Sequence, residues 1–177
     1  MKKHIFLNGF MGAGKSKIGP LLAARFACSF YDSDKLIEQE AGKSINDIFS
    51  EDGEEIFRKL ESMVIEKLSK EDVKSVIALG GGALVSDKNR AVAEKSGTIV
   101  YLKSDPRAIL ERIKHSEKRP LLNIARDENF EQNLLKMIID LLARRKAIYE
   151  KADLIFDRDP YEYTDAAAQL YEELIIL

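Results

Sequence analysis

Gly9-Phe10-Met11-Gly12-Ala13-Gly14-Lys15-Ser16 is the stretch that decides the fold, because it fits the pattern GxxxxGK[ST] and directly follows an apolar run at residues 5–7. The glycines let the backbone turn tightly, so that successive N–H groups point into one concavity, and the following helix adds the positive end of its dipole. Strand, loop and helix signals thus occur in the order that a P-loop requires. A glycine-rich turn that happens to precede a helix is the alternative.

The polar groups of this loop predict what it binds. Backbone N–H groups at Gly12, Ala13 and Gly14 would surround a polyphosphate. The ammonium group of Lys15 would reach the β and γ phosphates, and the hydroxyl of Ser16 would ligate Mg²⁺.

Length and composition favour one domain over residues 1–177, with 45% hydrophobic residues and a net charge of -2. With this net charge, the protein as a whole has no positive electrostatic field that would attract nucleic acid or an anionic membrane. The single cysteine, Cys28, excludes an internal disulfide and is expected to be a buried small hydrophobe. No apolar run approaches a membrane span, and a strand begins within about four residues, which leaves no room for a targeting peptide. We therefore expect a cytoplasmic protein without nucleic-acid or membrane partners.

Apolar runs alternate with helical periodicity along the whole chain. Strands are expected at residues 5–7, 29–31, 76–79, 98–102 and 154–156. Helices are expected at residues 17–26, 86–97, 130–149 and 164–176. Further helices are expected to start at residues 36, 44 and 106, and a longer one is expected to follow Asp52-Gly53 and end at about residue 69. This alternation predicts an α/β protein with the P-loop NTPase three-layer fold, a central parallel sheet of about five strands and functional sites at its C-terminal edge, similar to nucleoside monophosphate kinases. The polar stretch at about 113–128 is expected to be a mobile lid.

Carboxylates follow the second predicted strand at Asp32 and Asp34, where they could hold Mg²⁺ through water or accept a substrate proton. Alternatively, Asp34 caps a helix that starts at Lys35. Arg58 and Glu61 lie three residues apart on one helix face. By themselves they could be a surface pair worth about 0.2–0.5 kcal/mol.

Five motifs in order along the chain resemble the shikimate kinase family. They are GxMGxGKS at 9–16, DSD at 32–34, FRxxE at 57–61, GGG at 80–82 and RPLL at 119–122. The resemblance implies transfer of a phosphoryl group from ATP, with Mg²⁺, to the 3-hydroxyl of shikimate in the pathway to chorismate and the aromatic amino acids. It also implies a monomer and a substrate-binding region at about 33–61.

The resemblance further implies a set of shikimate-binding residues. They are Asp34, Phe49, Phe57, Arg58, Glu61, Gly80, Gly81, Gly82 and Arg145. Arginine suits the shikimate carboxylate because a planar guanidinium donates two parallel hydrogen bonds. Glu61 would orient Arg58, and the two phenylalanines would pack against the ring. The N–H groups of the glycine turn would approach the substrate, above all at Gly81.

For the phosphoryl step, the resemblance implies that Lys15 and Arg119 supply positive charge. Asp34 would orient the attacking hydroxyl and accept its proton, whereas Asp32 would reach Mg²⁺ through water. Arg112 would stack on the adenine, unless it is only a solvated helix arginine.

Three features depart from the family pattern. Lys17 places a cation among the nucleotide-binding residues where the family usually has threonine, and Ala147 replaces a proline before Tyr149. Arg158 lies in a segment that resembles the adenine-binding loop at a slightly different spacing. Two alternatives stay open at this point: another P-loop small-molecule kinase, acting on gluconate or a nucleoside monophosphate, or a catalytically inactive nucleotide-binding module.

Overall fold

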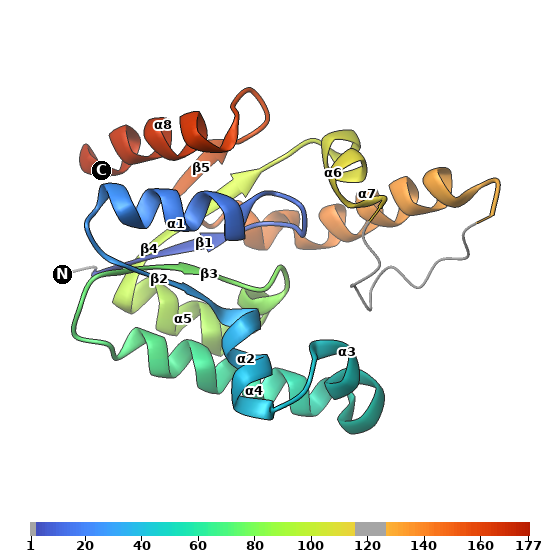
Figure 1. The fold of residues 1–177 in the computed structure, drawn as a ribbon, viewed down its shortest axis with the longest axis horizontal. Helices are drawn as coiled ribbons and strands as arrows, with labels where there is room; N and C mark the ends of the chain where they lie inside the picture. Colours follow the sequence, from blue (N-terminus) through green and yellow to red (C-terminus); the bar gives the residue numbers. More distant parts are fainter. Residues whose placement is uncertain (1–2, 116–126) are drawn as a thin grey trace.

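A parallel sheet forms the middle layer of the protein (Figure 1). The computed structural model describes residues 3–115 and 127–177, and within them the sheet has five strands in the order β2-β3-β1-β4-β5. The strands are β1 (His4–Asn8), β2 (Ser29–Asp32), β3 (Ser75–Ala78), β4 (Gly97–Lys103) and β5 (Leu154–Asp157). All the paired strands run parallel, so their C-terminal ends lie at the same edge.

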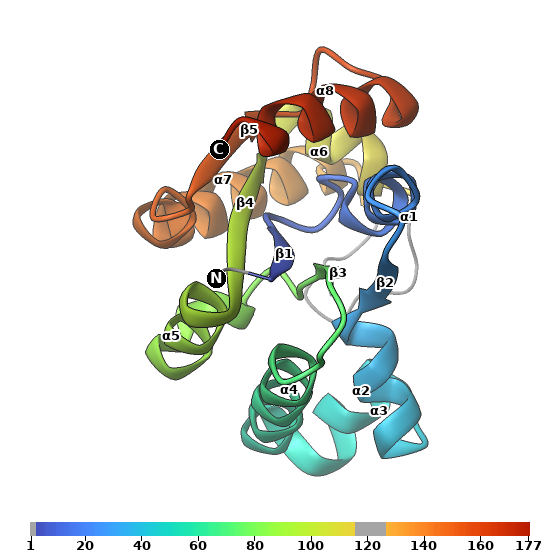
Figure 2. The ribbon, with the colours of Figure 1, turned by 90° about the vertical axis from the view of Figure 1, so that its left-hand side faces the viewer.

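Helices connect the strands and cover both faces of the sheet. They are α1 (Lys15–Arg25), α2 (Ser33–Ala41), α3 (Ile45–Asp47), α4 (Gly53–Ser69), α5 (Asp87–Ser96), α6 (Pro106–Ile113), α7 (Phe130–Tyr149) and α8 (Tyr163–Ile175). A short π-helix, η1 (Ile48–Asp52), precedes α4, and a 3₁₀ turn, η2 (Ala83–Val85), follows β3. Figure 2 shows α1 and α8 on one side of the sheet and α4 and α5 on the other.

Alternate residues of β1 explain the three layers. Ile5 and Leu7 belong to a core cluster with residues of α1 and α8, whereas Phe6, between them, belongs to the cluster with residues of α4 and α5. Side chains of a strand point alternately to opposite faces, so a strand between two helical layers must be apolar throughout. The predicted three-layer fold with a parallel sheet is therefore confirmed.

The start of α2 corrects one local prediction. The sequence placed this helix start at residue 35 or 36 and left Asp34 as a possible cap, but α2 begins at Ser33 and Asp32 is the capping residue. The Asp32 carboxylate accepts hydrogen bonds from the backbone N–H groups of Asp34 and Lys35. Asp34 thus lies inside the first turn, which leaves its carboxylate out of the cap.

Other sequence predictions have mixed outcomes. Cys28 is only partly buried, at the margin of the core cluster under α1, where we predicted full burial. Residues 116–126 of the predicted lid lie outside the described residues, and Arg119 with the RPLL motif lies there too. No helix in the described ranges has the length and apolar character needed to cross a membrane.

We predict that Gly9→Ala destabilises the fold more than Gly42→Ala. Both glycines have positive φ, 138° and 68°, but a Cβ at Gly9 would lie 2.7 Å from the carbonyl oxygen of Leu102, whereas Gly42 faces open space. Gly42→Ala should cost about 1–2 kcal/mol from backbone strain, and Gly9→Ala should cost about 1–3 kcal/mol more from the clash. Urea unfolding measures both losses, and equal losses would contradict the clash.

Candidate active site

A cleft of about 780 Å³ opens at the C-terminal edge of the sheet, between the P-loop, α2, α4, α7 and the loop after β3. Most predicted site residues line it. They are Gly12, Gly14, Lys15, Ser16, Lys17, Asp32, Asp34, Phe49, Phe57, Arg58, Glu61, Gly80, Gly81, Gly82, Arg112 and Arg145. Ala13 packs its methyl group into the core, and the side chain of Arg158 is buried outside the lining.

The P-loop end of the cleft brings the ammonium group of Lys15 together with two oxygen ligands. The Nζ atom of Lys15 donates to the carbonyl oxygens of Gly9 and Phe10, at 2.7 and 3.0 Å. The Ser16 hydroxyl donates to Asp32 Oδ2 at 2.6 Å. Hydroxyl and carboxylate oxygens are the ligands that Mg²⁺ prefers, and their contact across 16 residues of sequence fits a magnesium site beside a phosphate cradle.

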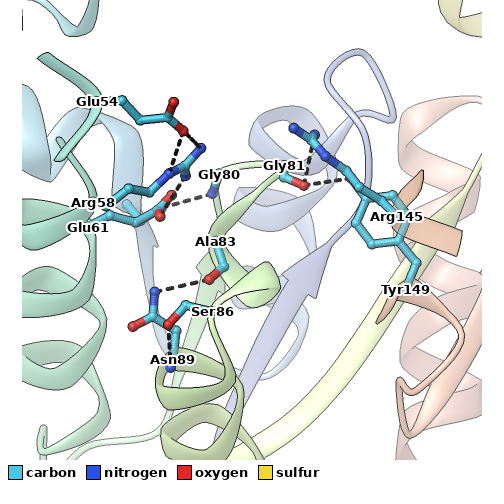
Figure 3. Close-up of polar contacts among 11 residues, drawn as sticks. Glu54, Arg58, Glu61, Gly80, Gly81, Ala83, Ser86, Asn89, Arg145 and Tyr149 are labelled. Atoms are coloured by element: carbon cyan, nitrogen blue, oxygen red, sulfur yellow. Dashed lines mark hydrogen bonds and ion pairs between the residues drawn. The ribbon is translucent and has the colours of Figure 1, made fainter. Parts of the chain in front are cut away.

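Arg58 is held by carboxylates on two sides (Figure 3). Its Nη1 donates to Glu61 at 2.8 Å, and its Nε and Nη2 donate to Glu54 at 3.3 and 3.2 Å. Glu61 is 1% exposed, whereas the Arg58 side chain is 38% exposed, so the carboxylate of this pair is removed from water and the guanidinium still faces the cleft. Glu61 thus contacts Arg58, and the role of Glu61 in orienting this arginine stays a prediction. Sequence reasoning missed Glu54, although its i,i+4 spacing to Arg58 on a helix was the available signal.

Arg145 reaches the same end of the cleft from α7. Its Nη1 donates to the carbonyl oxygen of Gly81 at 3.1 Å, and the hydroxyl of Tyr149 donates to the same oxygen at 2.6 Å (Figure 3). Tyr149 is 1% exposed and its ring packs against Tyr101. The carbonyl group of Gly81 is therefore fixed by two donors. One of them is Tyr149, which the sequence analysis used only to locate Arg145.

The two guanidinium groups border one small space. A Cβ built on Gly82 would lie 3.4 Å from both Nη atoms of Arg58 and 3.5 Å from Nη2 of Arg145. A side chain at this position would enter the space between the arginines. Two convergent guanidinium groups in a partly enclosed cleft form a site for a small anion, and a carboxylate matches their geometry.

Two carboxylates flank the neighbouring Gly80. A Cβ there would lie 2.8 Å from Asp34 Oδ1 and 3.1 Å from Glu61 Oε1, and the Gly80 N–H donates to the buried Ser33 hydroxyl at 3.1 Å. Burial raises the pKa of Glu61 and the charge of Asp34 raises it further, although Arg58 acts in the opposite direction. Asp34 and Glu61 therefore lie close together in the cleft, beside the loop after β3.

Aromatic side chains line the side of the cleft near η1. The rings of Phe49 and Phe57 lie 4.6 Å apart, and the guanidinium of Arg58 lies over Phe57 at 5.1 Å. Phe57 is buried, whereas Phe49 is partly exposed in the cleft lining. Together they give an apolar wall beside the anion site.

Arg112 lies beside the P-loop and donates to the Gly12 carbonyl oxygen at 3.3 Å. It also donates to Ser104 at 3.0 Å and pairs with Asp159 at 2.7 Å. The interpretation of Arg112 as a solvated helix arginine is therefore wrong. Arg158 instead stacks on the ring of Tyr163, at 4.6 Å.

A P-loop facing an anion site across one cleft, at the edge of a parallel sheet, defines the protein as a P-loop kinase of the small-molecule class. The family model for shikimate kinase matches residues 11–175. A shikimate kinase of Chlorobaculum parvum is 44% identical over 162 residues, which cover 90% of this chain and 86% of that protein. The chain belongs to the shikimate kinase family.

Solved structures agree with this assignment. Shikimate kinase from Acinetobacter baumannii in complex with shikimate superposes with a TM-score of 0.89 at 33% identity, covering 99% of this chain and 94% of that one. A gluconokinase from Sinorhizobium meliloti has a TM-score of 0.55 at 17% identity and covers 98% and 96% of the two chains. The second likeness shows a shared fold alone and does not favour gluconate as the acceptor.

We predict that Glu61→Gln gains free energy of unfolding relative to the wild type as pH rises above 4.5, the ordinary pKa of glutamate. Because the pKa of Glu61 is raised in the folded protein, the folded state binds this proton more tightly than the unfolded chain does. The stability associated with protonated Glu61 is thus lost as pH rises through the folded pKa, and glutamine cannot ionise.

Urea unfolding between pH 4 and 8 measures this difference. Glu66→Gln on the same helix is the control, because Lys70 lowers the pKa of Glu66 and the trend should have the opposite sign. A Glu61→Gln difference that falls with pH would show that the pair with Arg58 outweighs burial.

Proposed function

We propose that this protein is a shikimate kinase that transfers the γ-phosphoryl group of ATP to the 3-hydroxyl of shikimate, giving shikimate 3-phosphate and ADP. The observation that carries the proposal is the convergence of Arg58 and Arg145 at Gly82, across one cleft from the P-loop. Membership of the shikimate kinase family supports the same acceptor.

The anion site binds the shikimate carboxylate. Arg58 has both Nη atoms on the cleft side at Gly82, while Glu54 accepts from its Nε–Nη2 edge and Glu61 accepts from Nη1. Arg145 supplies the second guanidinium, and both ion pairs become stronger once the ligand excludes water. Holding these long side chains before substrate arrives lowers the entropy that binding must overcome.

The remaining cleft residues contact the body of the substrate. Phe49 and Phe57 pack against its ring. The backbone of Gly80, Gly81 and Gly82 lies close to it, because none of the three has a side chain and the Gly81 carbonyl is fixed by Arg145 and Tyr149. This arrangement suits a small hydroxylated acid better than a flat nucleobase.

The P-loop end binds the nucleotide. Lys15 exchanges the Gly9 and Phe10 carbonyl oxygens for phosphate oxygens, and the N–H groups of residues 12–14 donate to the same anion. Ser16 would hold Mg²⁺ directly and Asp32 through water, and the ion supplies positive charge that offsets charge on the phosphates. Lys17 adds an exposed cation at the start of α1.

Asp34 carries the acid–base role in this proposal. Its carboxylate lies beside Gly80 in the lining of the cleft that the P-loop and the anion site share, where it orients the attacking hydroxyl and accepts its proton. Catalysis of phosphoryl transfer depends mainly on positioning and charge, so a single oriented base suffices. Arg119, which lies outside the described residues, supplies further positive charge from the lid at about 113–128.

We also propose a single-domain, cytoplasmic monomer. The one sheet with its two helical layers joins residues from both ends of the chain, since α1 packs against α8. Size-exclusion chromatography with light scattering would test the monomer.

Acceptor specificity tests the main proposal. We predict ATP-dependent ADP release with shikimate and little release with gluconate or nucleoside monophosphates, measured separately in a coupled assay. Turnover with one of the other acceptors instead would favour a different P-loop small-molecule kinase. Nucleotide binding without turnover on any acceptor would favour a nucleotide-binding module.

We predict that Arg58→Ala and Arg145→Ala each weaken shikimate binding by about 2–5 kcal/mol, because a desolvated carboxylate loses a hydrogen-bonded partner. ADP affinity should change much less, because the hydrogen bonds of the two arginines go to Glu54, Glu61 and Gly81. Arg145 reaches the P-loop at the ring of Phe10, 5.9 Å away, and the Phe10 side chain is buried in the core. Isothermal titration calorimetry measures both ligands. Arg144→Ala is the matched control, since Arg144 is exposed on the same helix; equal losses for both ligands would refute the placement.

A further inference from the structure

Asp159, in the turn after β5, is a centre of hydrogen bonding at the nucleotide end of the cleft. Its Oδ1 accepts from the Ser104 hydroxyl at 2.8 Å and from Arg112 Nη2 at 2.7 Å. Its Oδ2 accepts from the backbone N–H of Asp105 at 2.5 Å. One carboxylate therefore connects the turn after β5 to the turn after β4 and to α6.

Arg112 is immobilised by this arrangement. Its Nη2 is paired with Asp159, and its Nη1 donates to the Ser104 hydroxyl and to the P-loop carbonyl oxygen of Gly12. Its side chain is 21% exposed, and the residue lines the cleft. The guanidinium is thus held against the P-loop by its Nη edge, in a residue that lines the cleft.

The chemistry of the pair suits a role in positioning. A free arginine side chain has about 2 kcal/mol of rotamer entropy, and a ligand that stacked on it would have to restrict that motion. Burial would raise the pKa of Asp159, but the Asp105 N–H and the Arg112 guanidinium lower it below its ordinary value, so the carboxylate stays ionised. The restriction is therefore already present before the nucleotide binds.

We propose that Asp159 is a positioning residue for nucleotide binding: it holds the Arg112 guanidinium against the P-loop so that its face receives a planar purine base. The inference rests on the part of the proposed function that assigns an adenine nucleotide to this end of the cleft. It does not depend on the identity of the acceptor.

A double-mutant cycle tests this proposal with Mg²⁺-ADP as the probe, measured by isothermal titration calorimetry. Asp159→Asn should weaken ADP binding roughly tenfold, the size of one charge-assisted hydrogen bond. Arg112→Ala should weaken it at least as much, and the double variant should match Arg112→Ala within about twofold, because Asp159 acts through Arg112. Asp165→Asn, an exposed acid on α8, should leave ADP binding unchanged.

Three results would overturn the proposal. They are unchanged ADP affinity in Asp159→Asn, additive losses in the double variant, or an equal loss of ADP and shikimate affinity, which would indicate general loosening of the fold. Thermal unfolding of each variant accompanies the titrations. If Asp159→Asn does not fold, Ser104→Ala removes one partner of the same carboxylate and should weaken ADP binding, but not on the Arg112→Ala background.

Since ADP binding is measured without an acceptor, failure of this inference is distinguishable from failure of the proposed shikimate activity.

Discussion

The parallel pairing of β1 between β3 and β4 is the constraint on which the site depends. In register, Leu7 lies opposite Ala78 on one side and Val100 on the other, so the C-terminal ends of these strands lie at the same edge of the sheet. The P-loop after β1, the acidic turn after β2 and the glycine turn after β3 therefore meet at one edge. Because a parallel strand must return by a crossover helix, each of these turns also begins or precedes a helix that carries further site residues.

The acceptor end of the cleft gathers opposite charges at close range. Arg58 and Arg145 border one space, and Glu54, Glu61 and Asp34 surround them. A buried carboxylate such as Glu61 costs desolvation energy, which its ion pair offsets only in part, as the direction of its pKa shift indicates. The site thus maintains ionised groups at some cost to stability, and in return the guanidinium edges are oriented before a ligand arrives.

The nucleotide end is built differently, because turns at the ends of three strands hold Arg112, which lies on α6. Asp159, Ser104 and Gly12 come from the turns after β5, β4 and β1, and all three contact Arg112. The acceptor end takes its side chains from α4, α7 and the start of α2 instead. A single sheet edge therefore supports two half-sites whose rigidity has separate sources, which explains why substitutions in one half are expected to spare the other.

Local sequence determined the elements and the donor half of the site. Apolar periodicity predicts the limits of the helix at 130–149, and glycine spacing predicts the P-loop directly after the first strand. Both signals depend on residues that are close in the sequence. Only the tertiary structure decided which acid of the DSD motif caps α2, because Ser33 is held by Gly80, 47 residues away. The Tyr149–Gly81 and Arg112–Asp159 contacts likewise join α7 and α6 to the turns after β3 and β5. No local pattern specifies such contacts, because the sheet register sets where each turn lies.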